Sequence, residues 1–193
     1  DAETVFDKAR SVHIVACGTS YHAGLIAKYW IESICQIPCR VEIASEYRYR
    51  NPVVMEDTLF VAISQSGETA DTLAALRAAK KAKYISTLVI CNVPESTMVR
   101  EAELVLLTKA GPEIGVASTK AFTTQLTVLS LLTIVIARRS GLDQNSEKEM
   151  VNQLLELPTL IDQILALDED IKELAKNFSN KHHALFLGRG IQN

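Results

Sequence analysis

The chain has 193 residues, of which 48% are hydrophobic and 22% are charged, and its formal net charge at pH 7 is −3. This length and balance fit one globular domain of ordinary size with some additional helix. A small negative charge supplies no basic field for nucleic acid or an acidic membrane surface, so we expect no nucleic-acid partner and only local binding of anions.

Five short apolar runs alternate with helical patterns along the chain. They lie at residues 12–17, 39–44, 59–63, 87–91 and 104–108. Parallel strands need crossover connections, usually helices, and their burial on both faces gives continuous apolar runs. We therefore predict an α/β fold, a five-stranded parallel sheet with helices on both faces.

The helical patterns lie between and after these runs. They begin after Ser20 and end before Pro38, then cover residues 70–83, a short piece after Pro94, and residues 118–139. Residues 1–10 read as a polar lead-in without an element of their own.

Residues 122–137 contain no charged side chain and raise the question of a membrane span. The run is shorter than the ~20 apolar residues that a bilayer needs, and hydroxyl and amide side chains interrupt it. We expect a helix buried within the domain or between subunits, and no membrane partner. No charged and apolar leader opens the chain, which favours a cytoplasmic protein.

The end of the chain departs from the alternating pattern. Residues 141–149 are a polar break, and residues 150–177 carry two helices divided near residues 167–168. Residues 183–190 then repeat the apolar strand and glycine turn of residues 13–19. We predict three parts: a domain over 1–140, connecting helices over 141–180, and the first strand of a truncated second domain over 181–193.

Three turns rich in hydroxyl groups follow predicted strands: Gly18-Thr19-Ser20, residues 64–69 (SQSGET) and residues 111–120 (GPEIGVASTK). In open parallel sheets ligands bind beyond the carboxyl ends of the strands, so these turns should converge on one crevice. Free N–H groups at a helix start and neutral hydroxyls suit a phosphate. Simple helix-capping turns are the alternative.

Two residues of the SQSGET turn need separate explanations. Gly67 has no Cβ, so we expect a phosphate oxygen to approach its N–H closely. Glu68 is a carboxylate beside a predicted anion site, and we expect it to point outward and complement the helix N-terminus.

The cysteines and histidines do not predict a metal or cofactor site. The cysteines lack the paired spacing of a zinc site and read as buried free thiols; they are Cys17, Cys35, Cys39 and Cys91. His22 has no carboxylate fixed beside it, so a structural role is favoured over acid or base catalysis. His182 and His183 are adjacent and would face opposite ways on a strand.

With these turns in place the chain resembles the SIS (sugar isomerase) domains of the glutamine:fructose-6-phosphate aminotransferases, or glucosamine-6-phosphate synthases, and among them the first SIS domain of the isomerase half. The motifs that carry the resemblance are CGTSYHAG at 17–24, EIASEYRYR at 42–50, SQSGETADTL at 64–73, EIGVASTKAFTTQL at 113–126 and KHHALFLGRG at 181–190. The resemblance implies an SIS-type αβα sandwich and a parent enzyme that makes glucosamine 6-phosphate from fructose 6-phosphate and glutamine in amino-sugar biosynthesis.

The resemblance also implies a set of substrate-binding residues. Phosphate contacts would come from Ser64, Gln65, Ser66 and Thr69, and sugar contacts from Thr19, Ser20, Val116 and Ser118. The bound ligand would be fructose 6-phosphate or glucosamine 6-phosphate.

The family's catalytic groups belong to a second SIS domain, the tail and a glutaminase domain, so the resemblance implies that this chain alone is inactive and acts with those domains in a homodimer. Two alternatives stay open: a regulatory SIS module that senses a sugar phosphate, and another sugar-phosphate isomerase of the same fold.

Overall fold

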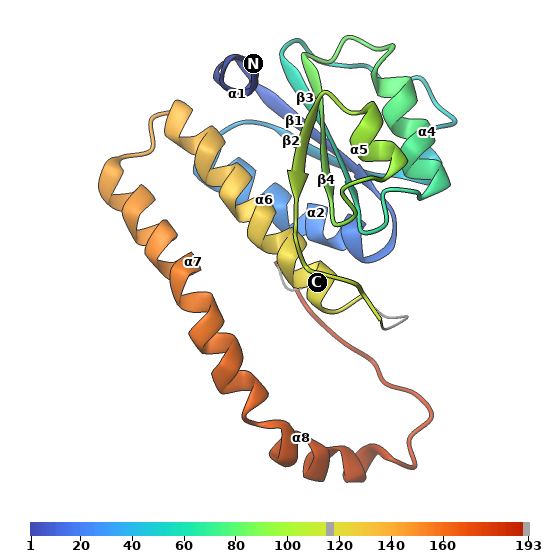
Figure 1. The fold of residues 1–193 in the computed structure, drawn as a ribbon, viewed down its shortest axis with the longest axis vertical. Coiled ribbons are helices and arrows are strands. Elements are labelled where there is room, and N and C mark those ends of the chain that lie inside the picture. The colour runs from blue at the N-terminus through green and yellow to red at the C-terminus, as the bar shows by residue number, and fades with distance from the viewer. Residues whose placement is uncertain (115–117, 191–193) are drawn as a thin grey trace. The chain divides into compact units, whose positions relative to one another are not determined.

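The computed structural model describes residues 1–114 and 118–190, and the chain falls into two units, Asp1–Leu142 and Asp143–Asn193. The first unit contains a five-stranded sheet in the order β2-β1-β3-β4-β5 (Figure 1). Its strands are β1 (Ser11–Ala16), β2 (Cys39–Ile43), β3 (Thr58–Ser64), β4 (Ser86–Cys91) and β5 (Leu104–Leu107). Every neighbouring pair is parallel, which confirms the predicted sheet.

The burial of each strand explains why the apolar runs identify the sheet. All residues of the three central strands β1, β3 and β4 are buried. The edge strands β2 and β5 are partly exposed. A central strand with helices on both faces has no side left for water, so its sequence is continuously apolar. The predicted runs therefore match the five strands to within one residue at each end.

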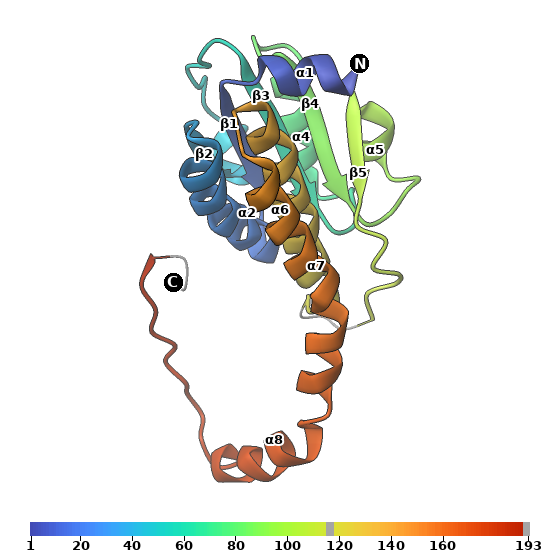
Figure 2. The same ribbon diagram turned by 90° about the vertical axis from the view of Figure 1, so that its left-hand side faces the viewer.

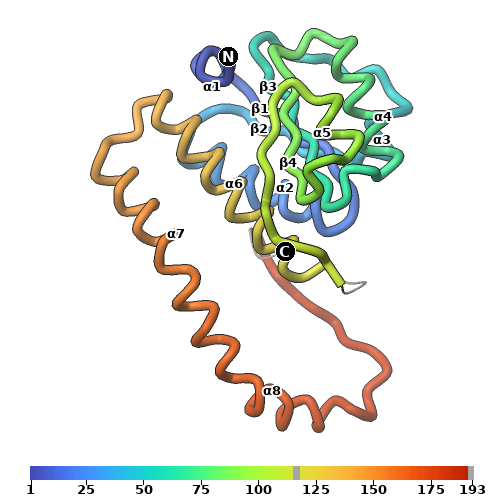
Figure 3. Tube along the Cα trace, viewed as in Figure 1, coloured from blue at the N-terminus to red at the C-terminus, as the bar shows by residue number. Residues whose placement is uncertain are grey.

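Helices cover both faces of the sheet (Figures 1 and 2). Val12, Ile14 and Ala16 of β1 pack in the core on the side of the helices α1 (Ala2–Lys8), α2 (Gly18–Trp30) and α6 (Lys120–Arg139) and of the π-helix η1 (Ile31–Cys35). Val15 belongs to the opposite core, on the side of α3 (Ala44–Tyr47), α4 (Ala70–Ala79) and α5 (Thr97–Glu101). Figure 3 shows α3 beside α4, which it contacts.

Two short helices were not expected from the sequence. The first, α1, occupies the polar lead-in; the Asp1 side chain caps it by accepting a hydrogen bond from the Glu3 N–H at 3.2 Å. The second, α3, directly follows β2 and buries Ala44 and Tyr47. Both are too short to give a clear periodic pattern of their own.

The apolar helix α6 is part of the core of the first unit. By length and composition it is the one helix among the described residues that could cross a membrane, and half of its apolar window is buried. One such helix is weak evidence, because the core helix of a globular domain has the same composition. Leu129, Leu132 and Ile136 pack in the core that contains Ile14 of β1.

The second unit contains α7 (Gln144–Leu165), α8 (Asp168–Ala175) and the 3-10 turn η2 (Lys176–Phe178). The break between the two helices lies where the sequence predicts it. The expected polar break at 141–149 is wrong in its second half, because α7 begins at Gln144. The carboxylate of Asp143 starts this helix by accepting hydrogen bonds from the N–H groups of Asn145 and Ser146 at 3.0 and 3.1 Å.

Residues 181–189 form no strand and are exposed. A strand is defined by hydrogen bonds to a neighbouring strand, and within the described residues none pairs with this segment. The expected first strand of a second domain, and the three-part division of the chain, therefore stay predictions.

The main polar group inside the sheet is His13 of β1, which is 4% exposed. Its Nδ1 lies 2.7 Å from the hydroxyl of Tyr84. Its Nε2 lies 2.9 Å from a carboxylate oxygen of Glu42, a close contact without hydrogen-bond geometry. Burial lowers the pKa of His13 to about 4, although the Glu42 carboxylate opposes this shift. The ring is therefore neutral at physiological pH.

We predict that His13 makes the fold sensitive to acid. The folded ring has a pKa of about 4 and the unfolded one 6.5, so the unfolded chain binds the proton first as the pH falls. The free energy of unfolding should drop by about 2–3 kcal/mol between pH 7 and pH 4.5 from this group. Urea unfolding at both pH values measures it. His13→Gln should reduce the loss and the exposed His22→Gln should not; an unchanged loss in His13→Gln would contradict the assignment.

Candidate functional site

A cleft of about 260 Å³ lies at the carboxyl ends of β1 and β3. Ten of the described residues line it: Cys17, Gly18, Thr19, Ser20, Ile63, Ser64, Gln65, Ser66, Thr69 and Thr72. Six of the eight residues expected to bind a sugar phosphate are in this set. The first two hydroxyl-rich turns therefore converge as predicted, although no ligand contact is tested by this geometry.

Two helices begin at the cleft. Helix α2 starts at Gly18, two residues after β1 ends, so Thr19 and Ser20 lie in its first turn and not in a preceding loop. Thr69 is the N-cap of α4, and its side chain makes no capping hydrogen bond. The first N–H groups of a helix have no partner within it and form the positive end of its dipole. Two such ends at one cleft favour an anion.

Ser64 shapes the loop between β3 and α4. It is 3% exposed, and its Oγ accepts a hydrogen bond from the Gly67 N–H at 3.0 Å. The same Oγ lies 3.2 Å from Oγ1 of Thr69. When Ser64 donates its single hydrogen to Thr69, the hydroxyl hydrogen of Thr69 is left for a ligand. Phosphate contact by Ser64 itself stays a prediction.

The expected role of Gly67 is wrong. Its N–H is taken by Ser64 and is not open to a phosphate oxygen. A glycine is required here for two other reasons: its φ is +67°, and an added Cβ would lie 2.0 Å from Oγ of Ser96 and 2.8 Å from Sγ of Cys91. Gly67 thus lets the loop pack against the end of β4 and the start of α5.

Glu68 does point away from the cleft, but it complements a different helix from the one expected. Its carboxylate accepts a hydrogen bond of 2.6 Å from the N–H of Thr97, the first residue of α5. This bond holds the pKa of Glu68 below its usual range. The carboxylate is therefore ionised and already paired outside the cleft.

Asn92 connects the cleft to the turn that follows β5. Its N–H donates to the carbonyl of Gln65 at 3.2 Å. Its side-chain oxygen accepts from Thr108 at 3.0 Å and from the Ala110 N–H at 2.8 Å. Its amide nitrogen donates to the carbonyl of Gly111 at 2.7 Å. Sequence reasoning missed this residue, because only the folded chain brings the two turns to it.

The third predicted turn is only partly described. Val116 lies outside the described residues. Ser118 is half-buried and is not among the residues that line the cleft. Its Oγ is buried and has no hydrogen-bond partner among the described residues. The sugar contacts expected from Val116 and Ser118 therefore remain predictions.

The described part of the cleft lining is uncharged. None of its ten residues is a lysine, arginine, histidine, aspartate or glutamate. Neutral hydroxyls, one amide and helix N-termini can bind a dianion by hydrogen bonds alone. The only acidic residue in the first turn of α4, Asp71, pairs with Arg48 at 2.6 Å.

Of the remaining candidates, the histidines and cysteines, Cys17 alone is among the described residues that line the cleft. His22 is exposed and does not line it, and within residues 1–114 and 118–190 no cluster of metal-binding side chains is present. All four cysteines are free thiols; Cys35, Cys39 and Cys91 are buried as expected, whereas Cys17 is only half-buried. Burial raises the pKa of Cys35 to about 11 and of Cys39 to about 12, so neither thiol is reactive.

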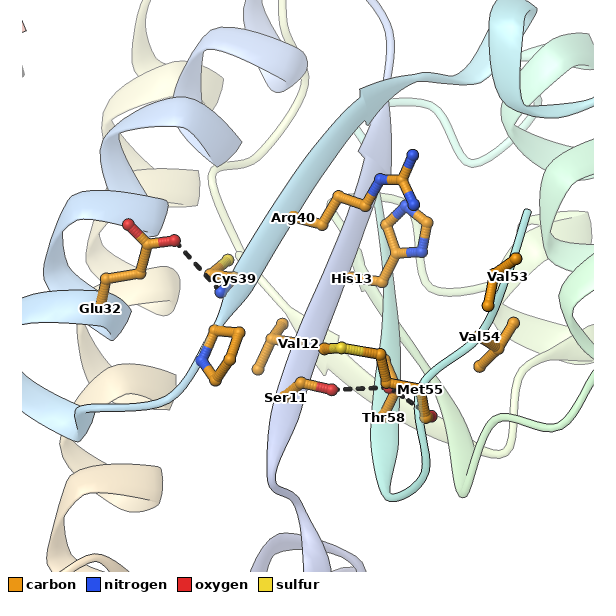
Figure 4. Close-up of a pocket in the computed structure, with 11 residues that line it drawn as sticks. Ser11, Val12, His13, Glu32, Cys39, Arg40, Val53, Val54, Met55 and Thr58 are labelled. Carbon is orange, nitrogen blue, oxygen red and sulfur yellow. Dashed lines mark hydrogen bonds between the residues drawn. The ribbon is translucent and has the colours of Figure 1, made fainter.

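A second cavity of about 160 Å³ lies at the amino ends of the same strands (Figure 4). Ser11 and Thr58, the first residues of β1 and β3, contribute to its wall and share a hydrogen bond of 2.6 Å. Arg40 lies beside the ring of His13. Most of the lining is apolar, and its two hydroxyl groups are paired with each other, so its chemistry does not resemble that of the cleft.

Comparison with known proteins agrees with the fold. The sequence profile of the SIS domain matches residues 6–135, and the chain belongs to the SIS domain family. It is 59% identical over 192 residues to glutamine–fructose-6-phosphate aminotransferase (isomerizing) of Pseudomonas putida, covering 99% of this chain and 31% of the relative. The corresponding Escherichia coli enzyme is 55% identical, with 100% and 32% covered. The chain thus spans about a third of the length of these relatives.

A solved structure shows the same arrangement. The C-terminal domain of glucosamine-fructose-6-phosphate aminotransferase from Francisella tularensis superimposes with a TM-score of 0.95 at 52% sequence identity. The match covers 98% of this chain and 54% of that domain. The SIS-type αβα sandwich expected from the sequence motifs is therefore confirmed.

We predict that Gly67→Ala destabilises the fold more than Gly111→Ala does, although both glycines have a positive φ. The new Cβ would meet Ser96, whereas a Cβ at Gly111, with φ +71°, would meet nothing within 4 Å. We expect a loss of roughly 2–4 kcal/mol for Gly67→Ala and roughly 1 kcal/mol for Gly111→Ala. Urea unfolding compares the two. Ser96→Gly should restore part of the Gly67→Ala loss, and equal losses at both glycines would refute the packing role.

Proposed function

We propose that this chain is the sugar-phosphate-binding part of the isomerase half of a glutamine:fructose-6-phosphate aminotransferase, whose whole protein makes glucosamine 6-phosphate from fructose 6-phosphate and glutamine. The observation that carries the proposal is the uncharged cleft at which two helix N-termini and several hydroxyls meet. The names of the close relatives support it.

The phosphate belongs at the turn between β3 and α4. Ser66 and Thr69 are half-buried, line the cleft and lie just before the first residue of α4. Oγ of Ser66 accepts a hydrogen bond from the Glu68 N–H at 3.2 Å, which leaves its own hydrogen for a phosphate oxygen. Gln65 adds an amide to the same wall. The sugar then extends toward Thr19 and Ser20 at the start of α2.

This arrangement separates binding from chemistry. A phosphate held at the helix ends contributes binding energy and orients the sugar, while the reacting carbons lie elsewhere. Among the described residues the lining contains no carboxylate, imidazole or amine that could act as a general acid or base. We place the catalytic groups in the second SIS domain and the tail, the ammonia source in the glutaminase domain, and the whole protein in the cytoplasm as a homodimer.

We predict that the phosphate group decides binding. Fructose 6-phosphate and glucose 6-phosphate should raise the melting temperature of the chain, because a ligand at a hundredfold excess over its Kd stabilises the fold by about 2.7 kcal/mol. Free glucose should not. Ser66→Ala and Thr69→Val each remove a donor to a charged acceptor and should weaken binding roughly ten- to a hundredfold.

The control for this titration is Thr123→Val, which removes an exposed hydroxyl on α6 away from the cleft. It should bind like the unmodified chain. Equal thermal shifts for the unmodified chain, Ser66→Ala and Thr69→Val would show that the phosphate does not sit at this turn, and no shift with any sugar phosphate would overturn the proposed function.

We also predict that the chain alone forms no glucosamine 6-phosphate from fructose 6-phosphate, with either glutamine or ammonia. Among the described residues the cleft offers hydrogen-bond donors and one titratable side chain, the thiol of Cys17, but no carboxylate or imidazole to move protons on the sugar. A discontinuous assay for amino sugar, run beside the whole enzyme of a relative, tests this. Turnover by a preparation free of that enzyme would contradict it.

A further inference from the structure

A buried glutamine of α6 contacts the serine at the start of α2. Nε2 of Gln125 lies 3.0 Å from Oγ of Ser20, and the two residues are 105 positions apart in the chain. Gln125 is 1% exposed and Ser20 is 7% exposed. Ser20 lines the cleft and Gln125 does not. The glutamine is thus one layer behind the cleft and reaches it through Ser20.

The chemistry of the amide fixes the direction of this hydrogen bond. An amide nitrogen donates and does not accept, so Oγ of Ser20 is the acceptor. The opposite orientation of the amide would leave its two N–H bonds buried without an acceptor, which is rarer than a buried oxygen without a donor. The single hydrogen of Ser20 therefore points to some other acceptor.

Packing alone does not account for an amide at this position. Oε1 of Gln125 is buried and has no hydrogen-bond partner among the described residues. An unpaired buried oxygen reduces stability, and an apolar side chain of similar size would avoid that loss. The neighbours along the same face of α6, Ala121 and Leu129, are apolar and buried. The interaction that the amide of Gln125 makes, and that an apolar side chain could not make, is its hydrogen bond to Ser20.

We propose that Gln125 is a positioning residue of the sugar-phosphate site. By donating to Ser20 from behind, it keeps the Ser20 hydroxyl as an acceptor on the α6 side and as a donor on the cleft side, where the ligand's oxygen atoms lie. Recognition of the ligand's oxygens thus depends on a residue that does not touch the ligand. The inference rests on the proposed function, because it assumes that a sugar phosphate occupies this cleft.

The decisive variant is Gln125→Glu, which keeps the shape of the side chain but replaces the hydrogen-bond donor that faces Ser20 by an acceptor. An ionised carboxylate only accepts, so Ser20 must donate to it and loses its donor to the ligand. We expect the Kd for fructose 6-phosphate, measured by calorimetry on the 193-residue chain, to rise at least tenfold at pH 8. Gln125→Leu leaves the hydroxyl free to rotate and should raise the Kd only about two- to fivefold.

A pH profile separates positioning from a structural defect. A buried carboxyl has a raised pKa, and its protonated form can donate to Ser20 as the amide does. The ratio of Kd between Gln125→Glu and the unmodified chain should therefore shrink toward 1 between pH 8 and pH 6, and dividing by the unmodified chain removes the titration of the phosphate itself. For Gln125→Leu the ratio should be flat. A flat ratio for Gln125→Glu overturns the proposal.

The Ser20→Ala background provides the second test. If Gln125 acts through Ser20, both substitutions at position 125 should change the Kd less than twofold once the hydroxyl is gone, and the pH dependence should disappear. Additive losses, or a Ser20→Ala variant that binds like the unmodified chain, overturn the inference. If thermal melting shows that Gln125→Glu does not fold, the effect of Gln125→Leu on the Kd is compared in the same way with and without Ser20→Ala. Failure of the unmodified chain to bind any sugar phosphate instead refutes the proposed function.

Discussion

Every strand of the sheet runs in the same direction, and this constraint decides where polar groups gather. The parallel register places Ala16 beside Ile63, and Ser64 beside Cys91, so the strands end along one edge. Each connection to a following helix must leave from that edge. The first two hydroxyl-rich turns, which are far apart in the sequence, therefore meet there together with the starts of α2 and α4.

The described lining of the cleft at this edge offers a ligand oriented neutral dipoles and no charged side chain. Acidic residues adjacent to it are directed to other partners: Glu68 to the N–H of Thr97 and Asp71 to Arg48. Their charges are thereby compensated before an anion arrives. A site of this kind recognises the geometry of oxygen atoms, because hydrogen bonds depend on direction more strongly than the attraction between full charges does.

The sequence predicts those parts of the molecule that depend on neighbours along the chain. The continuous apolar runs reveal strands buried on both faces, and the SQSGET turn predicts a place at the cleft for an anion, since each signal is local. The roles of Gly67 and Glu68 were not predictable, because they depend on Ser96 and Thr97 of a later helix. Gln125 is visible in the sequence only as a single amide in an apolar helix. Its proposed role could be inferred only from its contact with Ser20 in the folded chain.

The double use of the Asn92 side chain has a consequence for the chemical durability of the protein. Its nitrogen and its oxygen each hold part of the turn after β5, so an aspartate at this position, the product of spontaneous deamidation, would lose the bond to the Gly111 carbonyl. The reaction proceeds by attack of the next backbone nitrogen on the amide, and that nitrogen belongs to the β-branched Val93, whose bulk hinders the approach. Val93 thus slows the deamidation that would break the hydrogen bond between Asn92 and the turn after β5.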